Sequence, residues 1–254
     1  MLSTTQSILL PICAVIAALL FMAAVNWIWP WEKRREHNDQ IGWQLSVLGT
    51  TYAVILGFML YAVWTNFAAA EANVDLEANA LVNVYRLAEG LPDQQRVQLQ
   101  KLTVGYADAV INQDWPQMVA NQVPKETMQI NGDMWKTLMS VKGAASPAEI
   151  TAEDHALYEL SALTEHRRTR ILQSESRLPT VLWWVLLVGG GVTVASSCLF
   201  GSANKGLHAL QVFAFSLLIA LALVAIADIH RPFQGAIHVS DYPFVRAQEN
   251  MQGP

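Results

Sequence analysis

Long apolar stretches without an ionisable side chain divide this sequence into two pairs of segments around a more polar centre. Residues 7–28 and 45–67 contain no Asp, Glu, Lys or Arg, and in residues 178–227 Lys205 stands alone. A helix needs about 20 residues to cross a hydrocarbon core of about 30 Å. The pattern predicts four transmembrane helices, at about 7–29, 45–67, 179–200 and 207–228.

The second apolar segment turns polar without losing helical character. From Trp64 to Arg86 the sequence is rich in alanine, and it contains no Gly or Pro before Gly90. Helix propensity therefore favours one continuous rod that leaves the membrane and enters water. On such a rod Asn66, Asn73 and Glu77 share one stripe and Glu71 shares another with Asp75, so the rod has two different neighbours.

The polar centre, residues 68–177, predicts a helical extramembrane domain, because no sustained period-two pattern of β-branched residues indicates strands. Breaks are expected after Gly90 and at Asp114-Trp115-Pro116, where a new helix would start. Ser146 and Glu149 fit a capping box before a long helix. The expected fold is an all-α integral membrane protein, with a first hairpin at 1–67, the domain at 68–177, a second hairpin at 178–230 and an irregular tail at 231–254.

Composition supports this assignment and excludes some partners. Of 254 residues, 53% are hydrophobic and 15% are charged, against about 25% charged in soluble domains. Membrane lipid is therefore an expected partner. The net charge of −5 argues against nucleic acid, which requires a basic surface. Cys13 and Cys198 fall inside predicted spans, so they imply neither a disulfide framework nor a metal site.

Four spans place the end of the second, the start of the third and the end of the fourth at one membrane surface. If the helix after Phe67 runs antiparallel to the helix before Pro179, opposite charges meet there. Glu71 should approach Arg177, and Glu77 should approach Arg170 or Arg167. We predict a juxtamembrane ion-pair network of six residues: Glu71, Glu77, Arg170, Arg177, Asp228 and Arg231. The alternative is a set of surface pairs worth about 0–1 kcal/mol each, although Asp228 at the end of an apolar run needs a partner.

Other chemistry has little support in the sequence. The six histidines are scattered without metal-ligand spacing, and neither a phosphate-binding glycine loop nor a nucleophile elbow is present. We therefore predict no enzyme activity, no metal and no cofactor. The glycines at 189–191 in the third span either allow close helix packing or form a flexible, pore-facing segment.

Several stretches resemble one family of four-span membrane proteins, the bestrophin-like proteins. They include the segment around Glu77-Ala78, Arg170 and Arg177 before Leu178-Pro179, and Asp228 followed by Arg231-Pro232-Phe233 and Gly235. The layout is also similar to that of bestrophins, which are pentameric anion channels with cytosolic termini and a cytosolic helical domain after the second span. Two bestrophin features have no counterpart here, the acidic calcium clasp and the aromatic neck with proline in the second span.

The resemblance implies a homo-oligomeric channel, favoured as a pentamer, in a bacterial inner membrane with the domain and both termini in the cytoplasm. Basic residues flanking the spans do not decide this orientation. The pore would be lined by the second span and its extension, and the candidates are Gly49, Leu56, Asn66, Asn73 and Glu77. Rings of such residues set selectivity. Glu77 faces either the axis or Arg170, so a permeant anion or cation stays undecided. The alternative function is a non-conducting scaffold or sensor whose helical domain binds a partner or small ligand.

Overall fold

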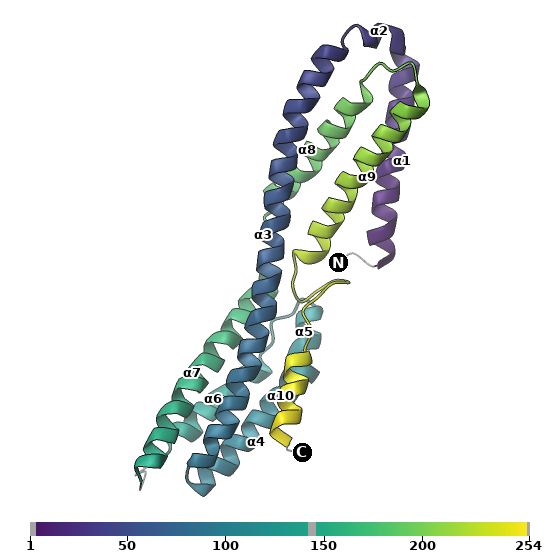
Figure 1. The fold of residues 1–254 in the computed structure, drawn as a ribbon. Coiled ribbons are helices and arrows are strands. Elements are labelled where there is room, and N and C mark those ends of the chain that lie inside the picture. The colour runs from purple at the N-terminus through teal and green to yellow at the C-terminus, as the bar shows by residue number, and fades with distance from the viewer. Residues whose placement is uncertain (1–3, 142–145, 253–254) are drawn as a thin grey trace. The chain divides into compact units, whose positions relative to one another are not determined.

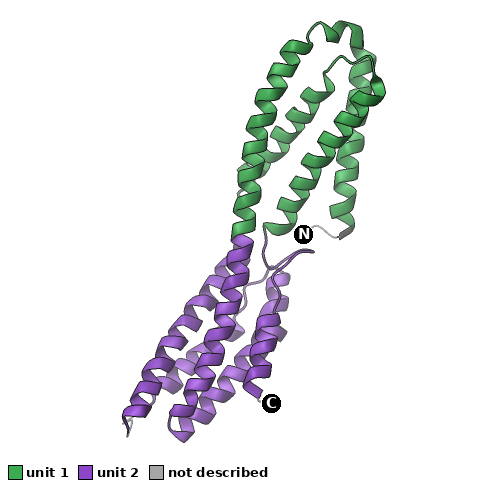
Figure 2. Cartoon of the chain, viewed as in Figure 1, with its two compact units in different colours: residues 1–65, 177–230 green, residues 66–176, 231–254 purple. Residues whose placement is uncertain are grey.

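The computed structural model describes residues 4–141 and 146–252, and every regular element within them is helical. It forms two compact units, one of residues 1–65 and 177–230 and one of residues 66–176 and 231–254 (Figure 2). One helix, α3 (Asn38–Leu87), contributes to both units (Figure 1). The all-α prediction is confirmed.

The first unit contains the membrane-spanning segments. Four helices are long and apolar enough to cross a membrane: α1 (Thr4–Ile28), α3, α8 (Thr180–Cys198) and α9 (Lys205–Ile229). Helix α1 lies against α8 and α9, which form a hairpin (Figure 1). The chain is therefore a multi-pass membrane protein.

Hydrogen bonds join the two short connections of this unit. The short helix α2 (Trp31–Arg35) places Arg34 so that it donates to the carbonyl of Cys198 at 2.9 Å and to the side chain of Asn26. Asn38 exchanges two hydrogen bonds of 2.9 Å with the backbone of Gly201. A Cβ at Gly201 would lie 2.6 Å from the carbonyl oxygen of Trp31, so only glycine fits this turn.

Two of the three consecutive glycines in α8 allow close helix packing. A Cβ at Gly189 would lie 2.8 Å from the ring of Tyr52, and one at Gly190 would lie 2.8 Å from its hydroxyl oxygen. That hydroxyl donates to the carbonyl of Leu186 at 3.0 Å. The two glycines therefore leave room for the side chain of Tyr52 from α3 to lie against α8. Gly191 has open space around it.

The second unit is a helical bundle around the extension of α3. It contains α4 (Asp93–Ala109), α5 (Trp115–Val119), α6 (Glu126–Met139) and α7 (Pro147–Glu175). Ser146 accepts from the backbone N–H of Glu149, whose side chain accepts from the backbone of Ser146, which confirms the capping box. Helices α4 and α5 are joined by a π-helical turn, Val110–Asp114, where the sequence predicted a break before a new helix.

The C-terminal segment corrects the prediction of an irregular tail. Residues Tyr242–Gln252 form a helix, α10, which packs against α4. Its buried residues, Phe244, Ala247 and Met251, are spaced by three and four positions, so they form one apolar stripe. Pro243 suits the first turn of this helix, because a helix leaves its first N–H groups unpaired. The stripe is only two turns long, too short for a clear periodic signal in the sequence.

Candidate functional site

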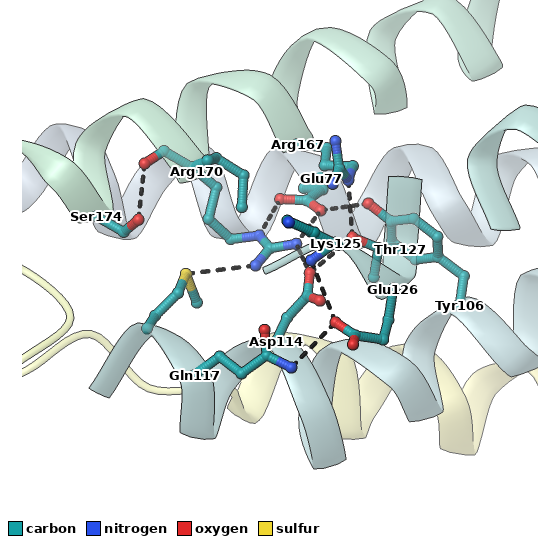
Figure 3. A network of polar contacts seen from close by, with 12 residues as sticks. Glu77, Tyr106, Asp114, Gln117, Lys125, Glu126, Thr127, Arg167, Arg170 and Ser174 are labelled. Atoms are coloured by element: carbon teal, nitrogen blue, oxygen red, sulfur yellow. Dashed lines mark hydrogen bonds and ion pairs between the residues drawn. The ribbon is translucent and has the colours of Figure 1, made fainter. Parts of the chain in front are cut away.

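A buried ionic cluster lies at the centre of the second unit (Figure 3). Arg170 of α7 is completely buried, and its Nε and Nη2 donate to the two carboxylate oxygens of Glu77 on α3 at 2.8 and 3.1 Å. The hydroxyl of Tyr106 on α4 donates to Glu77 at 2.7 Å. This fork-shaped pair is geometrically well formed, as buried ion pairs need to be.

A second acid, which the sequence analysis missed, completes the cluster. Asp114 is also completely buried, and its Oδ2 accepts from Nη2 of Arg170 at 3.0 Å and from the hydroxyl of Thr127 at 2.6 Å. Nε of Arg167 donates to the same Thr127 hydroxyl at 2.7 Å. The carboxylates of Glu77 and Asp114 therefore both bind the guanidinium of Arg170. The guanidinium of Arg167 is linked to Asp114 through the hydroxyl of Thr127 (Figure 3).

The electrostatics of the cluster follow from burial and proximity. Burial raises the pKa of Tyr106, and the neighbouring Glu77 carboxylate raises it further. Burial alone would lower the pKa of Arg170, but Glu77, Tyr106 and Asp114 together raise it above its ordinary value. Arg170 therefore stays charged, and the rings of Trp115 and Phe244 lie 5.8 Å from its guanidinium carbon.

Asp114 was missed because it was interpreted as the start of a new helix. Its position, four residues after the buried Val110 and seven after the buried Ala107, continues the buried face of α4 through the π-helical turn. Nothing in the local sequence marks such a turn; the neighbouring Trp115-Pro116 indicated a helix start instead. The cluster joins α3, α4, α6, α7 and the π-helical turn through side chains that are buried at Glu77, Tyr106, Asp114, Thr127 and Arg170.

The other members of the predicted network lie elsewhere. Glu71 and Arg177 are exposed and belong to different units, so their pairing stays a prediction. Arg231 donates to the side-chain oxygen of Gln234 at 3.1 Å. Of the six predicted residues, the structure therefore brings Glu77 and Arg170 together.

Asp228 has an unusual environment at the end of α9. It is 9% exposed, and its Oδ2 accepts from the hydroxyl of Ser7 at 3.4 Å. Within residues 4–141 and 146–252, its Oδ1 is buried without a hydrogen-bond partner. Among the described residues of the first unit, Asp228 therefore shows a hydroxyl partner, and the ionic partner that we expected is not seen.

The pore-lining candidates require correction, because most of them face the interior of their own chain. Asn73 is 7% exposed and Glu77 is fully buried. Leu56 packs on the cluster of Val63, Leu186 and Ile226. Gly49 lines a cavity between α3, α8 and α9, and Asn66 is half-buried. The stripe selected as small and polar packs against other helices instead of presenting a ring of side chains to water.

Asn73 shows why this stripe is polar. Its amide nitrogen donates to the backbone carbonyl of His166 at 2.9 Å, and its amide oxygen lies 2.9 Å from Nδ1 of the same residue. Because the carbonyl only accepts, the amide orientation is fixed and Nδ1 of His166 must donate. Asn73 and Glu77, one turn apart, thus join α3 to α7 by polar contacts.

The described residues contain no group of three or more His, Cys, Asp or Glu side chains arranged to hold a metal ion. Three of the four carboxylate oxygens of the ionic cluster instead accept from guanidinium and hydroxyl donors, and among the described residues Oδ1 of Asp114 is buried without a hydrogen-bond partner. This arrangement fixes helices in place.

Comparisons with known proteins agree with this architecture. A family model described as the bestrophin-like domain matches residues 12–244. The chain belongs to the bestrophin-like family. Its fold is similar to crystal structures of a bacterial bestrophin homologue from Klebsiella pneumoniae. One, of a point mutant, has 14% identity and a TM-score of 0.70, covering 96% of this chain and 99% of that one.

A second bestrophin-homologue structure, solved by zinc phasing, has 15% identity and a TM-score of 0.66, over 94% of this chain and 96% of that one. A structure described only as a membrane protein has 12% identity and a TM-score of 0.72, over 94% and 96% of the two chains. A comparison with curated proteins gives no match. At these identities the structural likeness establishes the fold, and the family model establishes the family.

Proposed function

We propose that this bestrophin-like chain forms a homo-oligomeric ion channel, favoured as a pentamer, whose pore is lined by α3. The observation that carries the proposal is the bestrophin-like match over residues 12–244. Helix α3 supports it, because this 50-residue helix belongs to both units and leaves one face uncovered. A face that the chain's own helices do not cover is available to other subunits and to ions.

The proposed pore face replaces the stripe inferred from the sequence. The exposed face of α3 is broad, and along its middle one set of exposed residues recurs at intervals of three and four positions, which makes a continuous stripe. In the first unit the side chains of this stripe are mostly large and apolar, and in the second unit they are small and include one acid, Asp75. The members of the stripe are Val54, Phe58, Tyr61, Thr65, Ala68, Ala72, Asp75 and Asn79. Glu77 no longer argues for cation selectivity, because Arg170 neutralises it.

We further propose the inner membrane of a bacterium as the location, with the helical unit and both termini in the cytoplasm. Support comes from the order of elements shared with bestrophins. Protease added to sealed inverted vesicles should cut the loop between α5 and α6, near Asn121, and protease outside right-side-out vesicles should not. Cleavage only from the periplasmic side would reverse the orientation.

Ion flux into liposomes that contain the purified full-length protein tests the channel function. Chloride-sensitive and potassium-sensitive dyes, used in parallel, should show flux of one or both ions above that of empty liposomes. Single-particle images of the detergent-solubilised protein should show rotational symmetry with an axial passage. A monomer or dimer that conducts neither ion would instead favour a non-conducting scaffold or sensor.

Replacing Asp75 with asparagine is expected to shift ion selectivity toward anions. A ring of carboxylates at the pore face attracts cations, and the substitution removes that charge while keeping the size of the side chain. In a salt gradient across a planar bilayer, the reversal potential should move toward the equilibrium potential of chloride, with a several-fold change in the permeability ratio. Asp154→Asn, an exposed acid of α7 outside the stripe, should leave the reversal potential unchanged. Equal behaviour of the two variants would remove Asp75 from the pore.

A further inference from the structure

A cavity of about 740 Å³ lies within the first unit, beside the connection between α8 and α9. Its walls come from the first turns of α3, the C-terminal end of α8 and the first turns of α9. It extends from Asn38, at the start of α3, and Ser202, in the connection between α8 and α9, to Thr50 and Phe215 in the membrane helices. These positions correspond to the outer turns of the predicted spans, where head groups meet hydrocarbon. The exposed residues Thr50 and Gln211 open it to the surroundings.

Several polar groups in this cavity have no partner in the chain. Within the residues that the structure describes, the side chains of Ser46, Thr50 and Gln211 make no hydrogen bond. Four other hydroxyls of the membrane helices donate to a carbonyl three or four positions earlier in their own helix; they are Thr65, Thr193, Ser197 and Ser216. Polar groups near hydrocarbon gain from a partner, so the cavity offers unused hydrogen-bonding capacity.

His208 adds a buried acceptor to the same cavity. It is 4% exposed, and its Nε2 lies 3.1 Å from the carbonyl oxygen of Ser197. Because a carbonyl only accepts, Nε2 donates to it, and in this tautomer Nδ1 carries the lone pair. Among the described residues Nδ1 has no hydrogen-bond partner. A ligand with a hydroxyl group could donate to it.

The lining also limits the charge of an occupant. None of the lining residues is Asp, Glu, Lys or Arg, so a phosphate or ammonium group would meet no opposite charge. Leu45, Val212 and Phe215 supply apolar walls beside the unpaired polar groups. Apolar walls with a few oriented polar groups are typical of small-molecule sites of 300–1,000 Å³.

We propose that this cavity binds an uncharged membrane lipid with a hydroxyl-bearing head group, of which a diacylglycerol is the simplest example. The hydroxyl donates to Nδ1 of His208 or bonds with Thr50 and Ser46, and the acyl chains leave along the apolar wall. Free polyols share the head-group chemistry, but they would leave the apolar wall uncovered. The proposal does not depend on ion conduction.

Photocrosslinking tests the proposal on the full-length protein in phosphatidylcholine nanodiscs. The probe is a diacylglycerol with a diazirine near the glycerol, and labelled peptides are identified by mass spectrometry. Labels should concentrate in residues 38–50 and 197–215. Unlabelled diacylglycerol should compete, whereas added phosphatidylcholine and free glycerol should not. Equal competition by phosphatidylcholine would indicate ordinary surrounding lipid and overturn the site, and equal competition by glycerol would overturn the lipid as ligand.

Two glycines of α3 provide a matched pair of variants. A Cβ at Gly49 or at Gly57 meets no atom within 4 Å, but only Gly49 lines the cavity. Gly49→Phe should therefore fill the cavity and reduce labelling by about tenfold or more, the loss expected when a bound group is displaced. Gly57→Phe should keep the labelling of the parent. Unchanged labelling in Gly49→Phe would overturn the proposal.

Thr50→Val gives a second test that preserves the shape of the side chain. Loss of one hydrogen bond should weaken binding about fivefold without changing the size of the cavity. Gly49→Phe and Thr50→Val should both elute from size exclusion at the volume of the parent protein. Reduced labelling then reflects a changed site and not a misfolded protein. Thr65→Val, whose hydroxyl bonds within its own helix, should bind the probe like the parent. If Thr50→Val and Thr65→Val bind equally well, the hydroxyl of Thr50 makes no contact with the lipid.

Discussion

Replacing Arg170 with methionine is expected to destabilise the helical unit by about 3–5 kcal/mol, the usual cost of breaking a buried ion pair. Methionine keeps an unbranched apolar side chain at this position but removes the positive charge and the three hydrogen bonds to Glu77 and Asp114. Glu77 and Asp114 would then stay completely buried without their guanidinium partner. An uncompensated buried carboxylate loses its hydration and gains nothing in exchange.

Limited proteolysis of the detergent-solubilised protein measures this effect, because cleavage within the bundle reports how often it opens. The rate should rise by more than a hundredfold if about 3 kcal/mol is lost and opening limits cleavage. Arg168→Met is the control, since this neighbouring arginine on α7 is exposed and should change little. Equal rates for the two variants would mean that the cluster is solvated.

Neutral partners should rescue the Arg170 variant. With Glu77→Gln and Asp114→Asn added, the site holds no buried charge, and the amides can bond with Tyr106 and Thr127. Replacing a whole buried ion network by neutral groups is often close to neutral for stability. The triple variant should therefore recover at least half of the lost protease resistance. Rescue would show that the Arg170 variant is destabilised by unpaired buried charge. If a packing defect were the cause, the two added substitutions would make the variant less stable still.

The sequence was sufficient for the fold because long apolar runs in a membrane protein permit few structures. Spans of about 20 residues must be helical, since lipid leaves no other partner for the backbone. Local signals also predicted the start of α7 from Ser146 and Glu149. The approach of Glu77 to Arg170 or Arg167 followed from an antiparallel arrangement of the two helices.

The orientation of the α3 stripe could not be derived in the same way. Asn73 and Glu77 are polar, and a polar stripe on a helix can face water or hold a buried polar seam. The choice depends on partners distant in sequence, His166 and Arg170. Asp114 was interpreted as a helix start because Trp115-Pro116 follows it, although the helix continues through it as a π-helical turn. The distant partners of these side chains leave no periodic signal in the sequence.

Replacing Trp115 with alanine is expected to destabilise the second unit by about 3–5 kcal/mol and to release α10. Truncation of a large buried aromatic residue removes its contacts and leaves a cavity. The ring of Trp115 is 6% exposed and lies edge-on to Phe233 at 5.5 Å and to Phe244 at 6.2 Å. These aromatic contacts connect the C-terminal segment to α5. The side chain of Gln234 adds one bond of 2.9 Å to the carbonyl of Met118.

Trypsin cleavage after Arg246 reports the release of α10, because a bound helix resists the extended conformation that a protease requires. Trp115→Ala should accelerate this cleavage more than cleavage after Lys101 in α4. Phe244→Ala removes the partner ring without changing α5. It should therefore accelerate cleavage after Arg246, while cleavage after Lys101 stays slower than in Trp115→Ala. Val119→Ala, at a 41% exposed position of α5, should behave like the parent. Slow cleavage after Arg246 in both aromatic variants would contradict this prediction. It would mean that the apolar stripe of α10 alone holds this helix on α4, and that the aromatic contacts are a consequence of that packing.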